Sequence, residues 1–250
     1  MISAIVLLSL LFVVPVAYAE TDPILITKSG GTNKIIFDGK WTTGLEWKPT
    51  SWNELKYNQT VVQLRTAHQE NFIYIVIDAV DDIAISNDDR AVVCFDGKNN
   101  KDTIADSDDY CFLVSPNSDP VTYQGTTNIK QFKTVPNPEG FIGIGAQSDQ
   151  NDRYSSIPHT SYEFRIPIEL FGRSDNYGFF VSVYDSSLQK FYSWPDLQLN
   201  QDFQKISPSK WGNIVSPDKT MPEFGIPIVF LFAFICIVVF LTKTRQNTWP

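Results

Sequence analysis

Short strand-like segments, separated by turn-forming residues, fill most of the sequence between residues 34 and 215. Apolar and polar residues alternate through Tyr162–Ile166 and Gly178–Asp185, which places every second side chain on one face of a sheet. Phe72–Ile77 is apolar at each position, as in a central strand covered on both faces. Further strands are expected at residues 35–37, 61–67, 91–95, 110–114, 121–123, 141–145, 190–194 and 212–215, and one helical turn at 168–171. About ten short strands predict a single all-β domain that folds as a two-sheet sandwich.

The N-terminus has the layout of a secretory signal peptide. Ile2–Val16 is apolar, Ala17-Tyr18-Ala19 is a small-x-small cleavage site, and Glu20 begins a polar segment. No basic residue precedes the apolar stretch, so an uncleaved N-terminal anchor is the alternative. The apolar stretch is shorter than the roughly 20 residues of a membrane-spanning helix, and we therefore expect residues 1–19 to be removed.

A second apolar stretch, Phe224–Leu241, has no charged or strongly polar side chain. As a helix it would span roughly 27 Å, close to the hydrocarbon thickness of a bilayer. Lys243 and Arg245 follow it, and basic residues favour the cytoplasmic side. A buried core helix is the alternative. We expect one transmembrane helix at 224–241, followed by a cytoplasmic tail at 242–250. The protein would then lie in the cell membrane, with an extracellular domain at 20–215 and a short stalk at 216–223.

The net charge argues against nucleic acid as a partner. The chain carries 20 basic and 28 acidic residues. Without Lys243, Arg245 and Glu223, the part that we expect to be extracellular has 18 basic and 27 acidic residues, a net charge of −9. Phosphates would be repelled by such a surface, which has no basic stripe. The acidic balance is typical of a soluble surface domain.

Cysteine usage agrees with an extracellular location. Cys94 and Cys111 each lie within a strand-like segment, and pairing of these strands would allow a disulfide worth about 3 kcal/mol in the chain-entropy model. Two buried free thiols are the alternative. Asn58-Gln59-Thr60 is a glycosylation sequon in an expected loop.

Motifs for catalysis are missing from the sequence. His68 and His159 occur in unrelated contexts, and there is no Gly-x-Ser-x-Gly, His-Glu-x-x-His or phosphate-binding glycine motif. The acidic pairs Asp81-Asp82 and Asp88-Asp89 are expected to be solvated, as adjacent acids in loops usually are. A glycosidase pair from distant strands remains an alternative. We expect a protein that is not an enzyme.

Calcium is the metal that the sequence suits best. The segment from Asp96 to Asp109 is crowded with aspartate and asparagine, whose hard oxygen atoms calcium prefers. It does not follow the EF-hand spacing, and a solvated acidic loop is an equal alternative.

Aromatic side chains beside predicted loops suggest a sugar site. A flat ring can pack on the apolar face of a sugar while polar neighbours bind its hydroxyl groups. Packing at the ends of the sandwich is the alternative for any one ring. The expected ligand-binding residues are Trp47, Trp52, Tyr123 and Trp194.

Taken in order, several segments resemble the DOMON-like domains that are similar to family 9 carbohydrate-binding modules. They are Ile36-Phe37-Asp38-Gly39-Lys40 with Trp47, Arg65-Thr66-Ala67-His68 leading into Phe72–Asp78, Val93-Cys94-Phe95-Asp96, Asp108-Asp109-Tyr110, Tyr162-Glu163-Phe164-Arg165-Ile166-Pro167 and Trp211-Gly212. The resemblance covers roughly residues 34 to 215.

This resemblance implies an antiparallel, jelly-roll-like sandwich that often binds sugars and often carries structural calcium. It places Asp38, Asp96 and Asp109 on acidic positions of the family, and we expect these residues to bind the metal. Haem-binding members of the group use a methionine and a histidine as axial ligands. The only methionines here are Met1 and Met221, so no haem is expected.

The C-terminus resembles the PEFG-type archaeal sorting signals. Pro222-Glu223-Phe224-Gly225 stands directly before the apolar stretch and its basic tail. The resemblance implies that an archaeosortase-like enzyme cuts near the motif and attaches the protein to a membrane lipid. Together these features predict a surface-anchored, carbohydrate-binding module. A structural or adhesion protein that contacts other surface proteins is the first alternative, and a glycan-acting enzyme is the second.

Overall fold

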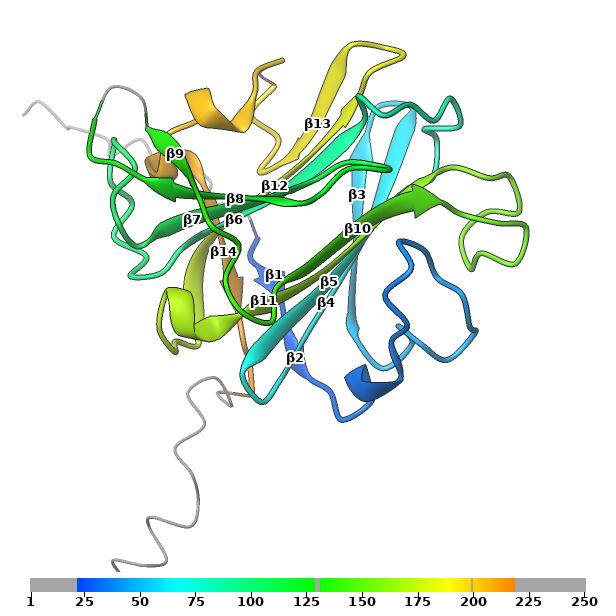
Figure 1. The fold of residues 1–250 in the computed structure, drawn as a ribbon, viewed down its shortest axis with the longest axis horizontal. Helices are drawn as coiled ribbons and strands as arrows, with labels where there is room; N and C mark the ends of the chain where they lie inside the picture. Colours follow the sequence, from blue (N-terminus) through cyan, green and yellow to red (C-terminus); the bar gives the residue numbers. More distant parts are fainter. Residues whose placement is uncertain (1–21, 129–130, 199, 219–250) are drawn as a thin grey trace, which may run out of the picture.

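Two β-sheets lie face to face in the computed structural model, which describes residues 22–128, 131–198 and 200–218 (Figure 1). The described helices are 3-10 turns at Thr32–Lys34, Ile168–Leu170, Phe203–Lys205 and Pro208–Lys210. None of the helices in these ranges is long and apolar enough to cross a membrane. The predicted signal peptide, the 224–241 helix, the tail and the Pro222–Gly225 motif fall outside the described residues.

The larger sheet, called sheet A, has eight strands. Its order is β1 (Ile24–Leu25), β14 (Gly212–Val215), β12 (Asn176–Asp185), β6 (Arg90–Asp96), β7 (Asp109–Val114), β8 (Val121–Gly125) and β9 (Phe132–Val135), and β13 (Lys190–Trp194) also pairs with β12. Sheet A therefore carries both the predicted disulfide strands and the acidic 97–108 loop that joins them.

The second sheet, sheet B, has six strands. Its order is β10 (Ile142–Gln147), β11 (Thr160–Pro167), β5 (Phe72–Ala79), β4 (Thr60–Gln69) and β2 (Thr27–Lys28), and β3 (Ser51–Tyr57) also pairs with β4. The continuously apolar β5 lies at the centre of this sheet, as its sequence predicts.

The prediction of an antiparallel sandwich is only partly correct, because both sheets are mixed. The N-terminal segment pairs in parallel with β14 through Ile24 and then with β4 through Thr27. Ile26, fully buried, lies between these two pairings. The first segment therefore crosses from an edge of sheet A to sheet B, and in Figure 1 it runs beside the orange C-terminal strand. Two-residue strands carry no recognisable period, which explains why the sequence did not predict them.

Alternating side chains fill the space between the sheets. Tyr162, Phe164 and Ile166 of β11 face Phe179, Val181 and Val183 of β12 across one fully or almost fully buried core. The predicted face of each strand is therefore confirmed.

Two smaller apolar clusters cover the outer faces. On sheet A, Phe132, Phe203 and Trp211 surround the Cys94–Cys111 pair. On sheet B, the 35–50 segment packs through Ile35, Trp41 and Trp47 against Val76. The strand expected at 35–37 is not formed, because Ile35 and Phe37 pack on the outer face of sheet B and the segment does not pair with an edge strand. Strands β3 and β9 were not predicted from the sequence.

Candidate functional site

Three buried aspartates meet at one end of the sandwich. Asp82 follows β5, Asp89 precedes β6 and Asp185 ends β12, so the chain brings them together from three separate segments. They are 4%, 0% and 3% exposed, and a carboxylate oxygen of each lies within 4.8 Å of one from the others. We call this group the aspartate triad. The sequence prediction that both acidic pairs are solvated is wrong for one member of each pair, while Asp81 and Asp88 are exposed as expected.

The hydrogen bonds of the aspartate triad are unevenly shared. Asp89 accepts bonds from Ser86 and Ser186, and Asp185 accepts them from the residues that follow it. Neither carboxylate oxygen of Asp82 has a hydrogen-bond partner among the described residues, and the same is true of the buried hydroxyl of Tyr162. Burial, followed by the charges of Asp89 and Asp185, raises the pKa of Asp82 to about 6.

These features fit a hard divalent cation. Buried like charges repel unless a positive charge compensates them, and buried oxygen atoms without hydrogen bonds cost free energy. Calcium prefers several oxygen ligands in a flexible arrangement, which the carboxylates of Asp82, Asp89 and Asp185 can supply. The residues present therefore fit the calcium that the sequence led us to expect, at a position that the sequence did not indicate.

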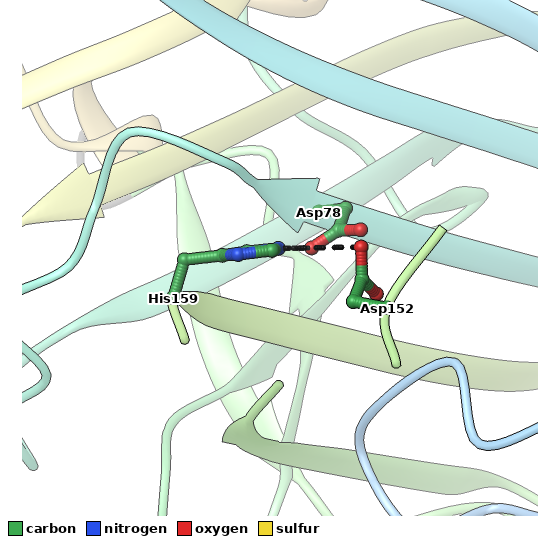
Figure 2. Close-up of side chains that lie close together, drawn as sticks. All are labelled: Asp78, Asp152 and His159. Atoms are coloured by element: carbon green, nitrogen blue, oxygen red, sulfur yellow. Dashed lines mark hydrogen bonds and ion pairs between the residues drawn. The ribbon is translucent and has the colours of Figure 1, made fainter. Parts of the chain in front are cut away.

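A second cluster joins β5 to the loop before β11 (Figure 2). Asp78 points from β5 toward His159, and Asp152 approaches the same ring from the loop. His159 Nε2 is hydrogen-bonded to Asp78 and lies 3.9 Å from Asp152 Oδ1. The other ring nitrogen, Nδ1, lies 2.8 Å from the carbonyl oxygen of Ile157. Both ring nitrogens face acceptors, so the imidazole is held in its charged form.

The electrostatics of this cluster favour an ion pair. Burial lowers the pKa of His159, but the hydrogen bond and charge of Asp78 outweigh this effect and raise it to about 9. Ser148 Oγ lies 3.0 Å from Nδ1, which resembles a Ser-His-Asp arrangement. Ser148 and His159 are buried, however, so a substrate has no access to the hydroxyl. We interpret the cluster as a fastening of the 148–158 loop onto sheet B.

Two of the four predicted sugar-binding rings are core residues. Trp47 is fully buried between the 35–50 segment and sheet B. Trp194 is 8% exposed within the main core, where its ring lies 5.9 Å from Phe179. A ring without an exposed face cannot stack on a sugar. We therefore correct the prediction for Trp47 and Trp194, which pack the sandwich.

The other two rings lie on different sheets. Trp52 of β3 is 54% exposed, and its indole nitrogen donates to Gln63 at 2.6 Å. Tyr123 of β8 is half-buried and packs on Phe203, with 5.2 Å between ring centroids. The four predicted residues therefore do not form one aromatic patch.

The structure divides the predicted calcium ligands between two layers. Asp96 and Asp109 are directly opposite each other on β6 and β7, and both are fully buried. Burial raises the pKa of Asp109 to about 8. Asp38 instead lies over sheet B, where its backbone N–H donates to Glu163 at 2.9 Å. The three residues expected to share a metal are thus not brought together.

The cysteines and the sequon occupy defined positions. Cys94 and Cys111 are directly opposite across β6 and β7, and a disulfide joins them. Asn58 is exposed at the two-residue turn between β3 and β4, with a left-handed φ of 49°. This geometry leaves the Asn58 side chain accessible to a modifying enzyme.

Comparison with solved structures identifies the fold. A family 9 carbohydrate-binding module from Caldicellulosiruptor kristjanssonii in complex with cellotriose superposes with a TM-score of 0.53 at 16% identity, covering 78% of this chain and 93% of the module. The chain shares its fold with these modules. A structure of a family 9 module from the same organism with glucose gives a TM-score of 0.50 at 17% identity, covering 78% and 95%. No protein-family model and no curated relative matches the sequence.

Proposed function

We propose that this protein is a carbohydrate-binding module displayed at the cell surface and that it catalyses no reaction. The observation that carries the proposal is the shared fold, which spans nearly the whole length of modules that are described in complex with cellotriose and glucose. The ordered motifs of the sequence support the same assignment and favour a DOMON-like relationship.

Calcium at the aspartate triad is a second part of the proposal. Asp82, Asp89 and Asp185 would hold the ion, and its positive charge would compensate the three carboxylates that burial brings together. The ion would also tie the connection between β5 and β6 to the end of β12. The proposed role is structural, because the three carboxylates are buried and offer no surface to a ligand.

Anchoring at the surface rests on the two ends of the sequence. We propose a cleaved signal peptide at 1–19 and a membrane attachment at 224–241, with Pro222–Gly225 as a sorting motif for an archaeosortase-like enzyme on an archaeal cell. Intact-mass measurement of the native protein tests this. A terminus near Gly225 with a lipid adduct supports sorting, whereas a retained Trp249-Pro250 terminus means that the helix stays.

One observation favours the alternative of a structural or adhesion protein. Trp41, Trp47, Trp194 and Trp211 are all buried, and Trp52 alone among the tryptophans in the described ranges is well exposed. A sugar site would therefore depend on tyrosine or phenylalanine rings, or on Trp52.

Glycan binding by the full chain separates these functions. The purified protein is passed over immobilised polysaccharides, with calcium or with a chelator, and soluble glucose and cellotriose are tested as competitors. Retention that the sugars reverse supports a binding module. Lack of retention on every polysaccharide supports the structural alternative, and release of new reducing ends would indicate a glycan-acting enzyme.

A further inference from the structure

A groove of about 430 Å³ opens where the edge of sheet B meets sheet A. One wall comes from the end of β3 and its turn, and the other comes from β13 and the residues that follow it. A volume of this size falls within the range of roughly 300–1,000 Å³ that is usual for small-ligand sites. We call it the β3–β13 groove.

Two tyrosine rings form the base of the β3–β13 groove. Tyr57 is half-buried, Tyr192 is 5% exposed, and their centroids lie 5.5 Å apart. Burial, followed by the charge of Asp196, raises the pKa of Tyr57, so its hydroxyl remains a neutral donor at physiological pH. Ring surface combined with a hydroxyl suits a ligand that has both apolar and polar faces.

Polar side chains of both signs stand around these rings. The Lys190 ammonium lies 5.1 Å from the centroid of Tyr192, and Asp196, Gln198 and Asn200 are exposed on the segment after β13. Asn200 already bonds to backbone groups of β13 and its turn, and one oxygen of Asp196 accepts from the Gln198 N–H. Asn200 and Asp196 are thus held in place.

Hydrogen-bonding capacity remains available in this arrangement. Within the described residues, the side-chain amide of Gln198 and the second oxygen of Asp196 make no hydrogen bond to another protein group. One amide and one carboxylate oxygen can together donate to and accept from neighbouring hydroxyl groups.

The charge balance points to an uncharged ligand. Lys56 at the rim is 3.0 Å from Glu54 and is therefore already paired. Lys190 and Asp196 are opposite in sign within the β3–β13 groove, and the surrounding domain is acidic. Lys190 would attract an anionic sugar, but Asp196 and the acidic domain around the groove would repel it, whereas a neutral sugar would meet donors and acceptors without this repulsion.

We propose that the β3–β13 groove is the sugar-binding site and that its ligand is a neutral pyranose, packed on Tyr57 and hydrogen-bonded by Asp196, Gln198 and Lys190. This inference rests on the proposed function and adds the location and class of the ligand to it.

The test measures binding of glucose, cellotriose and glucuronate to the full chain by titration calorimetry. Gln198→Ala and Asp196→Ala remove groove groups that are exposed, so the fold should tolerate both changes. Glu139→Ala is the matched control, because it removes an exposed carboxylate outside the groove. Near-ultraviolet circular dichroism checks that each variant is folded, and Lys190→Gln serves as a third groove variant if either change disturbs the fold.

We expect each groove variant to weaken binding of neutral sugars at least about tenfold, which corresponds to about 1.4 kcal/mol, while Glu139→Ala binds as the wild type does. Glucuronate should bind more weakly than glucose. Wild-type binding that survives in all groove variants would overturn the groove while leaving the proposed function intact. Stronger binding of glucuronate would overturn the ligand class. Failure of the wild type to bind any sugar would remove the proposed function itself.

Discussion

The indole nitrogen of Trp47 donates a 2.8 Å hydrogen bond to a carboxylate oxygen of Glu163, and neither side chain is exposed. The other oxygen of Glu163 accepts from the backbone N–H groups of Asp38 and Gly39 at 2.9 and 2.8 Å. Gly39 has a φ of 85°, and an added Cβ there would lie 2.7 Å from Ala146. Glu163 therefore holds Asp38, Gly39 and Trp47 of the 35–50 segment against the outer face of sheet B.

Trp47 and Trp52 should differ sharply in their contribution to stability. Trp47→Ala removes a fully buried ring and leaves Glu163 without one donor, so we expect a loss of about 3–5 kcal/mol in the free energy of unfolding. Trp52→Ala removes a ring that is 54% exposed, and about 0.5 kcal/mol is expected. Urea unfolding measures both values. Equal losses would contradict the assignment of Trp47 to the core.

The strands that the sequence predicted are those with a clear apolar period. β5, β11 and β12 bury one or both faces, and burial is what selects alternating or continuous apolar residues. Ser51–Tyr57 forms β3 at an edge, where Trp52, Glu54 and Lys56 face solvent and only Leu55 is buried. An edge strand of this kind has too little apolar surface to be recognised.

The candidate site was harder to predict because its parts are distant in sequence. Asp82 and Asp185 are separated by about a hundred residues, and the pairing of β12 with β6 brings Asp185 close to Asp89. A signal did exist for two of the three acids, since Asp89 directly precedes β6 and Asp185 is the last residue of β12. Asp82 had no such signal, because Asp81 lies one residue nearer to the end of β5 and is nevertheless exposed. Adjacent acids thus need to be judged one residue at a time. The β3–β13 groove likewise depends on β3, which was not predicted.

Calcium should stabilise the protein through the aspartate triad. We expect the melting temperature to rise on adding calcium and to fall with a chelator, because the ion compensates three buried carboxylates. Asp82→Asn and Asp89→Asn should each abolish the calcium-dependent shift. Asp88→Asn changes an exposed neighbour and should retain the full shift. A chelator-independent melting temperature in the wild type would rule out the metal.

The His159–Asp78 pair should make the free energy of unfolding decrease as the pH rises above neutral. The folded protein raises the pKa of His159 from 6.5 to about 9, so it holds this proton more tightly than the unfolded chain does. The resulting stabilisation is complete below about pH 6.5 and is lost as the pH rises through about 9. Between pH 7 and 10, the wild type should lose more stability than His159→Asn, by up to about 1.4 kcal/mol per pH unit. Parallel curves for the two proteins would show that His159 does not titrate in this way.

A glycan on Asn58 should weaken sugar binding. Asn58 lies at the rim of the β3–β13 groove and is exposed, so an attached glycan would compete with a ligand for the same space. Protein from a host that glycosylates the sequon should bind cellotriose about tenfold more weakly than the Asn58→Gln variant from the same host. Mass spectrometry confirms occupancy. Equal affinities at full occupancy would place the ligand away from this rim.

Sugar binding by the intact protein is the most direct measurement of the central claim. Titration of the calcium-saturated full chain with cellotriose should give a saturable binding isotherm with a Kd below about 1 mM, equivalent to about −4 kcal/mol. The Gln198→Ala variant should show at least a tenfold higher Kd. The absence of measurable binding for glucose, cellotriose and every immobilised polysaccharide, in a protein shown to be folded, would contradict the assignment of this sandwich as a carbohydrate-binding module.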